Sequence, residues 1–130
     1  MPTITAISHI TLTVTDLERS VHWYADTLGL RRGVDMSGPG WKRVIMVTDQ
    51  GVVVGLQAHE RTSADDSFDE TRVGIDHLSF ACADRAEVED WSRQLDAAGI
   101  AHSDIHGDPA SVLTITDPDG IAIEFFARPA

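Results

Sequence analysis

Apolar and polar residues alternate in the short segment SHITLTV, residues 8–14. One side of an extended chain there carries Ile10, Leu12 and Val14, and the other side carries His9, Thr11 and Thr13. The same period of two returns at residue 77, where Leu78, Phe80 and Cys82 alternate with His77, Ser79 and Ala81. The pattern predicts two short strands, each with an apolar face and a polar face that begins at a histidine.

Each of these strands is followed by a segment typical of an amphipathic helix. Asp16 and Asp84 are good N-terminal caps, and each follows its histidine by seven residues. The apolar stripes expected to face a core are Leu17, Val21, Tyr24 and Leu28 in the first helix and Val88, Trp91, Leu95 and Ala98 in the second. Glu87 completes a capping box, and Gly29 and Gly99 can end the two helices. The matching offsets indicate an internal repeat.

The two halves also match after their helices. The segments VIMVTDQGVVVGLQ, residues 44–57, and VLTITDPDGIAIEFF, residues 112–126, each suggest two strands around a tight turn that contains glycine. Each half is therefore expected to contain a strand, a helix and about three further strands. We predict an α+β fold of two βαβββ repeats, about residues 4–59 and 75–128, whose mixed sheets curve into a cup. Residues 60–74 are polar and acidic and form the expected connection within a single domain of residues 1–130.

The polar faces of the two repeats carry side chains that can hold a metal ion. In the last strand the odd-numbered residues 121–125 take the apolar face, which leaves Glu124 on the face of the histidines. If the two sheets curve towards each other, His9, His77 and Glu124 converge. Two imidazoles and one carboxylate suit Fe²⁺, Mn²⁺, Ni²⁺, Co²⁺ or Zn²⁺ and leave coordination positions open for a substrate.

Further residues on these faces are candidates for substrate contact or catalysis. Aligning the two glycine turns places Gly55 opposite Glu124, so a symmetric site would lack its fourth ligand. Gln57 and His59 follow on the same face, and both could orient a substrate or move a proton. After a small change of register Gln57 could instead reach the metal, while Glu124 is a candidate for catalysis as well as a ligand. The other candidates for substrate contact are Thr11, Ser79 and Phe126.

Composition narrows the classes of partner. The chain has 21 acidic and 10 basic residues, and a net charge of −11 repels nucleic acid and anionic membranes. A single cysteine, Cys82, excludes an internal disulfide and is expected to be a buried structural thiol. His22, His102 and His106 are expected to be exposed. The first residues do not resemble a signal peptide and no apolar run is long enough to span a bilayer, so we expect a cytoplasmic protein.

The chain resembles the vicinal oxygen chelate superfamily, which includes glyoxalase I, extradiol dioxygenases, fosfomycin-resistance transferases, methylmalonyl-CoA epimerase and bleomycin-resistance proteins. The resemblance rests on SHITLTVTDLERSVHWYADTLGL, GIDHLSFAC and TDPDGIAIEFF and extends over essentially the whole chain. It implies the glyoxalase/bleomycin resistance/dihydroxybiphenyl dioxygenase fold, with metal ligands at His9, His77 and Glu124. The glyoxalase I pattern has a carboxylate where this chain has Gly55, and the epimerase pattern can use a glutamine that Gln57 would supply. The transferases and extradiol dioxygenases use two histidines and one glutamate, although the dioxygenases' extra catalytic histidine and tyrosine have no clear match here.

Two functions from different classes are compatible with these residues. The first is a metal-dependent lyase, isomerase, transferase or dioxygenase that chelates two neighbouring oxygens of a small metabolite. The second is a metal-free protein that sequesters a drug or metabolite, for which the net charge of −11 would suit a cationic guest. The presence of all three ligand residues favours the enzyme, but neither the metal nor the substrate follows from the sequence. We also expect a homodimer that covers exposed sheet edges, with the cup closed within one chain or between two.

Overall fold

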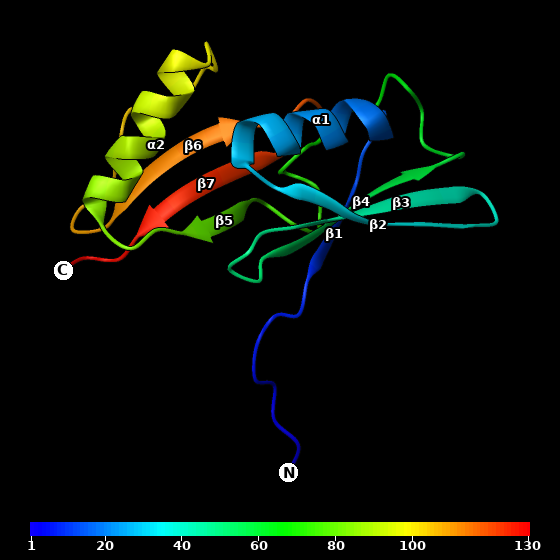
Figure 1. Cartoon of the computed structure of the whole chain (residues 1–130), viewed down its shortest axis with the longest axis horizontal. Helices are drawn as coiled ribbons and strands as arrows, with labels where there is room; N and C mark the ends of the chain where they lie inside the picture. Colours follow the sequence, from blue (N-terminus) through cyan, green and yellow to red (C-terminus); the bar gives the residue numbers. More distant parts are fainter. The chain divides into compact units, whose positions relative to one another are not determined.

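The computed structural model describes residues 1–130 and divides them into two compact units, Met1–Asp66 and Ser67–Ala130 (Figure 1). Both units contain a mixed sheet with one helix, as the repeat predicts. The α+β class expected from the sequence is confirmed, and the units are described below one at a time.

The first unit follows the predicted order of a strand, a helix and three strands. It comprises β1 (Ile10–Thr13), α1 (Leu17–Leu28), β2 (Arg31–Gly38), β3 (Trp41–Val47) and β4 (Val53–His59). The sheet has the order β1-β4-β3-β2, and β1 is parallel to β4 while the other neighbours are antiparallel. This topology puts the strand that follows His9 at an edge of the sheet, beside the last strand of its unit.

The second unit repeats this arrangement with one strand fewer. It comprises β5 (Leu78–Ala81), α2 (Arg85–Ala97), β6 (Ser111–Thr116) and β7 (Ala122–Ala127), in the sheet order β5-β7-β6. Again the edge strand that follows the histidine, β5, is parallel to the last strand, β7.

Three strands were expected after α2, and an irregular segment takes the place of the first of them, before β6. His106 and Val112 form an isolated bridge, and Ser103 pairs with Thr114. The Ser103 hydroxyl oxygen accepts a hydrogen bond from the Thr114 backbone N–H at 2.9 Å. A side chain there takes the place of a backbone carbonyl, and so the regular ladder does not form.

The predicted helix caps are present in the structure. The Asp16 carboxylate accepts a hydrogen bond from the Arg19 backbone N–H, and the Asp84 carboxylate accepts one from Glu87. The Glu87 carboxylate also accepts from the backbone N–H of Ala83, which is the reciprocal half of a capping box shifted by one residue. Gly29 follows α1 with φ of 72°, a left-handed conformation that glycine adopts without strain.

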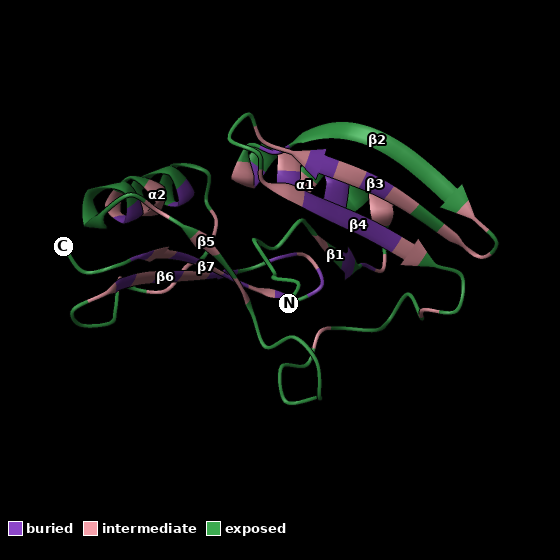
Figure 2. Cartoon of the chain, turned by 90° about the horizontal axis from the view of Figure 1, so that it is seen from below, coloured by how far each residue is buried: buried purple, intermediate pink, exposed green.

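Each sheet buries its apolar face under the helix of its own unit (Figure 2). Helix α1 packs on β3 and β4, and α2 packs on β6 and β7. In the first unit the buried set is Leu12, Val14, Val21, Tyr24, Leu30, Val44, Met46, Val54 and Leu56. In the second it is Val88, Leu95, Leu113, Ile115, Ile121, Ile123, Phe125 and Ala127. The opposite faces of the sheets are thereby left for polar side chains.

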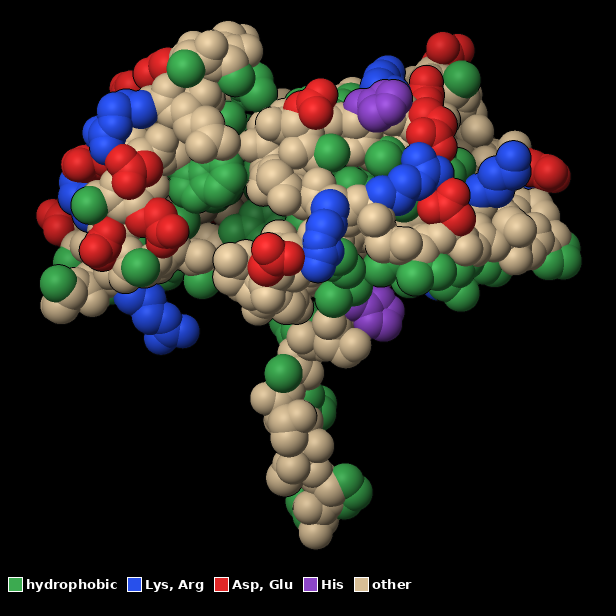
Figure 3. Space-filling view, viewed as in Figure 1, with side chains coloured by type: hydrophobic (Ala, Val, Ile, Leu, Met, Phe, Trp, Pro, Cys, Tyr) green, Lys and Arg blue, Asp and Glu red, His purple; other side chains and the backbone are tan.

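Charged side chains of both signs are interspersed on the surface around α2 (Figure 3). Arg85 pairs with Glu89 and Arg93 pairs with Asp90 on this helix. Neither helix of the protein is long and apolar enough to cross a membrane.

Candidate functional site

The strand registers of the two units assign equivalent positions to Gly55 and Glu124. In the first sheet Thr11 on β1 pairs with Gly55 on β4, and in the second Ser79 on β5 pairs with Glu124 on β7. Thr11 and Ser79 each lie two residues after the histidine that precedes their strand. The registers agree with the alignment of the repeats made from the glycine turns, so Glu124 has a glycine as its counterpart.

His77 and Glu124 approach each other on the polar face of the second sheet. His77 Nε2 lies 3.4 Å from Glu124 Oε2, and the two side chains are 44% and 21% exposed. His77 Nδ1 lies 2.8 Å from the Asp76 carboxylate, which can only accept, so Nδ1 carries the proton. Neutral His77 therefore directs the lone pair of Nε2 to the side of Glu124.

This pair fits one divalent cation. Metal bonds to imidazole nitrogen and carboxylate oxygen are about 2.0–2.2 Å long, so two ligand atoms lie roughly 2.8–3.1 Å apart at octahedral angles and roughly 3.3–3.6 Å apart at tetrahedral angles. The observed separation of 3.4 Å falls within the tetrahedral interval. The Asp76 carboxylate supplies the outer hydrogen bond that fixes the tautomer of a metal-binding histidine.

The carboxylates around His77 also raise its pKa. The hydrogen bond that His77 donates to Asp76 is the main cause and the charge of Glu124 adds to it, which together outweigh the opposing effect of burial. Because folding raises this pKa above the ordinary 6.5, protonated His77 stabilises the fold fully at lower pH. That stabilisation is lost as the pH rises through the pKa of the folded state.

Replacing Asp76 by asparagine should lower the pKa of His77 in the metal-free protein, since the strongest stabiliser of the imidazolium is removed. NMR titration of the imidazole Cε1–H resonances measures this change directly. Asp65→Asn, which changes an exposed carboxylate in the connection, is the control and should leave the His77 titration unaltered. An unchanged His77 titration in Asp76→Asn would contradict the assigned hydrogen bond.

His9 lies immediately before β1, as His77 lies immediately before β5. It is exposed, and its Nδ1 is 2.9 Å from the hydroxyl oxygen of Ser8. Within each unit no three His, Cys, Asp or Glu side chains are gathered as a metal site. The structure thus brings together His77 and Glu124, while the convergence of His9 with them stays a prediction.

The Thr11 side chain occupies the place of a fourth ligand in the first unit. A Cβ added at Gly55 would lie 2.7 Å from Thr11 Oγ1 and 3.1 Å from Thr11 Cγ2. Both distances are shorter than ordinary van der Waals contacts, so any side chain at this position requires Thr11 to shift. A carboxylate at this position, as in the glyoxalase I pattern, meets the same contact.

Gly55→Ala should therefore destabilise the protein by about 1–3 kcal/mol, the usual cost of overpacking. Thr11→Ala in the same chain should recover much of that loss, because it removes both of the closest atoms. Urea unfolding of the wild type, both single variants and the double variant measures the coupling. Strictly additive effects of the two substitutions would show that the side chains do not meet.

Gln57 and His59 belong to a hydrogen-bond chain that includes an arginine. Arg43 Nε donates to Gln57 Oε1 at 2.6 Å, and Gln57 Nε2 lies 3.2 Å from His59 Nε2. Arginine is only a donor, which fixes the amide orientation and makes His59 Nε2 the acceptor. The oxygen of Gln57 is thus directed to Arg43, an arrangement that does not present it to a metal.

The sequence analysis missed Arg43 and its neighbour Trp41. Val44 and Met46 on β3 are fully buried, so alternation assigns residues 41, 43 and 45 to the polar face. This pattern was available in the sequence, but the contact of Arg43 with Gln57 depends on the pairing of β3 with β4.

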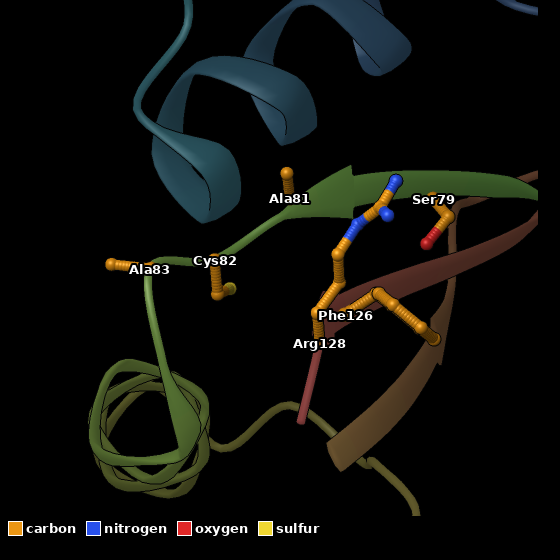
Figure 4. Close-up of a pocket in the computed structure, with 6 residues that line it drawn as sticks. All are labelled: Ser79, Ala81, Cys82, Ala83, Phe126 and Arg128. Atoms are coloured by element: carbon orange, nitrogen blue, oxygen red, sulfur yellow. The ribbon is translucent and has the colours of Figure 1, made fainter. Parts of the chain in front are cut away.

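Ser79 and Phe126 line a surface hollow in the second unit, together with Arg128 (Figure 4). Ser79 precedes Ala81 on β5, and Arg128 extends from the end of β7 towards β5. Because Ser79 pairs with Glu124, the hollow adjoins the candidate metal pair. The two predicted substrate contacts thus lie at one recess.

Cys82 lines the same hollow and is half-buried. Burial raises the pKa of its thiol to about 11, and the carboxylate of Glu87 adds to the shift. The thiol is therefore protonated near neutral pH and is a poor nucleophile.

The histidines outside the candidate site differ in exposure. His22 and His106 are exposed, as expected. The expectation for His102 is wrong, since only 13% of its side chain is exposed. Its two ring nitrogens lie 2.7 Å from Asp96 and from the Ser103 carbonyl, contacts that depend on the loop after α2 folding back onto the helix. These hydrogen bonds raise the pKa of His102.

The chain belongs to the Glyoxalase/Bleomycin resistance protein/Dioxygenase superfamily, whose family model matches residues 6–125. It is 31% identical to protein YqjT of Bacillus subtilis (strain 168) over 92% of this chain and 96% of that protein. It is also 30% identical to the catechol-2,3-dioxygenase of the same organism over 95% of this chain. The match covers 41% of the dioxygenase, so the chain spans less than half of that enzyme.

Solved structures of the family share the fold. The glyoxylase/bleomycin resistance protein/dioxygenase domain from Frankia sp. EAN1pec is 32% identical, with a TM-score of 0.87 over 96% of this chain and 93% of that one. The fosfomycin resistance protein FosX from Listeria monocytogenes, solved with Mn(II) and sulfate, has a TM-score of 0.70. That match covers 97% of this chain and 94% of the other at 18% identity, which establishes similarity of fold alone.

Proposed function

We propose that the protein is a divalent-metal-dependent enzyme that binds a small oxygenated metabolite through two neighbouring oxygens. The observation that carries the proposal is the pair of His77 Nε2 and Glu124 Oε2, 3.4 Å apart, with Asp76 holding the proton on the other ring nitrogen. His9, in the equivalent position of the other repeat, is the proposed third ligand.

The bound metal would act as a Lewis acid that polarises the chelated oxygens. Three protein ligands leave coordination positions for a substrate, and Ser79 and Phe126 border the recess beside Glu124. Thr11 lies on the polar face of the first sheet, where Gln57 holds Arg43 and His59 in place. Glu124 is also the proposed proton carrier, since its carboxylate is only partly exposed.

The number of protein ligands available to the metal favours some reactions of the superfamily over others. Thr11 fills the space beside Gly55, and the side-chain oxygen of Gln57 is bonded to Arg43. Among the predicted metal ligands of the first unit, this leaves His9. A site of two histidines and one glutamate is the set that the resemblance implies for the transferases and dioxygenases of this superfamily. The relative named as a catechol-2,3-dioxygenase supports chemistry on a small oxygenated compound.

A homodimer is part of this proposal. Strands β1 and β2 form the edges of the first sheet, and Val34 and Met36 on β2 are 56% and 41% exposed. Pairing with a second copy would cover such an edge and could bring the His9 of one chain to the ligands of the other.

Metal analysis of the purified protein tests the proposed function. Protein prepared without chelator or affinity metal should contain about one divalent ion per chain, since three such ligands give a strong site. Chelator-stripped protein should recover one equivalent on titration with Mn²⁺, Fe²⁺ or Zn²⁺. Failure to bind any of these ions at micromolar concentration would contradict the enzyme and favour a metal-free binding protein.

A further inference from the structure

Four side chains are stacked on the polar face of the first sheet. The ring of Trp41 packs on Gly38, where an added Cβ would lie 2.5 Å from the indole Nε1. The guanidinium carbon of Arg43 lies 4.9 Å from the centroid of the Trp41 ring. Gln57 accepts from Arg43 Nε at 2.6 Å and contacts His59 in turn. Arg43 is thereby held from two directions.

The terminal nitrogens of this arginine have no partner within the protein. Arg43 is half-buried and is bonded through Nε alone, which leaves the four N–H groups on Nη1 and Nη2. Other arginines on strands and helices pair with carboxylates, as Arg31 does with Asp49 and Arg32 with Glu18. The chain has 21 acidic residues, yet none pairs with Arg43.

We propose that Arg43 binds a carboxylate group of the substrate, so that the metabolite taken by this protein is an organic acid. The inference rests on the proposed function, because Arg43 lies on the polar face of the first sheet, the face of the strand that follows the proposed ligand His9. Thr13 pairs with Gln57 on that face, Thr11 lies two residues before it, and the same alternation continues back to His9.

The chemistry of the stack suits this ligand. A guanidinium offers two parallel N–H groups whose spacing matches the two oxygens of a carboxylate. Stacking on Trp41 and the hydrogen bond to Gln57 restrict its rotation before binding, which reduces the entropy lost on complex formation. The net charge of −11 repels an anionic substrate in general, so an oriented cation on the polar face provides selective attraction.

The test compares catechol-type chelators by calorimetry on the full chain loaded with Mn²⁺. The probes are 3,4-dihydroxybenzoate, 3,4-dihydroxyphenylacetate and 3-(3,4-dihydroxyphenyl)propionate, which share vicinal oxygens and carry the carboxylate on tethers of increasing length. The corresponding amides are the uncharged controls. At least one acid should bind the wild type about tenfold more tightly than its amide, as expected for a charge-assisted hydrogen bond.

Two substitutions assign that preference to one residue. Arg43→Gln should bind the acid and the amide equally, whereas Arg43→Lys should keep part of the preference for the acid. Arg128→Gln tests the rival cation, because Arg128 is an exposed arginine that lines the hollow beside Ser79. A preference that persists in Arg43→Gln, or that Arg128→Gln abolishes instead, overturns the proposal, as does the absence of any preference in the wild type.

Failure of the proposed metal-dependent function can be distinguished from failure of the carboxylate site at Arg43. If neither catechol nor its derivatives bind to the metal-loaded protein, chelation fails and the proposed function with it. Arg43 is then tested on metal-free protein with benzoate and benzamide, monitored by tryptophan fluorescence. A preference for benzoate that Arg43→Gln removes supports the carboxylate site, and equal behaviour of the two ligands overturns it.

Discussion

His77→Ala should lower the affinity of the protein for a divalent metal more than about 100-fold, beyond the usual effect of losing an outer-shell partner. The substitution removes the imidazole that lies 3.4 Å from the Glu124 carboxylate. The two proposed ligands that remain, Glu124 and His9, are too few to hold the ion tightly. Glu124→Gln should have a comparable effect, because an amide oxygen has no negative charge. Titration of chelator-stripped protein with Mn²⁺ or Zn²⁺ measures both affinities.

His22→Ala is the matched control for the metal experiment. His22 is an exposed histidine on helix α1, outside the polar faces of both sheets. Its removal should leave both the stoichiometry and the affinity unchanged. If wild type and His77→Ala hold the metal equally well, the assignment of His77 as a ligand is wrong.

Phe125→Ala should destabilise the folded state by about 3–5 kcal/mol, the usual cost of truncating a buried aromatic residue. Phe125 is 2% exposed and its ring stacks on Trp91 of α2 with centroids 4.3 Å apart. Truncation leaves a cavity between β7 and the helix that covers it. Urea unfolding followed by circular dichroism measures the loss.

Phe126→Ala provides the comparison within the same strand. Phe126 is only partly buried and points to the opposite face, where it lines the hollow beside Ser79. Its truncation should cost about 1 kcal/mol, as for an average substitution. Equal losses for the two variants would contradict the assignment of faces on β7.

The alternation of apolar residues was sufficient to predict the buried faces of β1 and β7. Leu12 and Val14 on one side of β1, and Ile123 and Phe125 on β7, are at most 6% exposed, as their spacing requires. The same spacing places Glu124 on the face of the histidines, whereas its pairing with Ser79 depends on the register of β7 with β5. The candidate metal pair of the second unit was therefore foreseeable as two residues on one face, although not as a distance.

Features that depend on individual hydrogen bonds were not predictable in this way. The strand expected between α2 and β6 is lost because the hydroxyl group of Ser103 bonds to Thr114, and many serines in loops make no such bond. His102 is mostly buried because the loop after α2 returns it to Asp96. The engagement of Gln57 by Arg43 requires the register of β3 with β4, which alternation does not specify.

The contact between Gly55 and Thr11 has a consequence for how such a protein can evolve. A mutation from Gly55 to glutamate, which would add a second carboxylate ligand, brings the new Cβ against Thr11. Reduction of residue 11 to alanine or glycine beforehand removes the closest atoms, and the glutamate then becomes accessible at a lower cost in stability. Descendants of this sequence would thus reach a four-ligand centre more readily by one order of mutations than by the other.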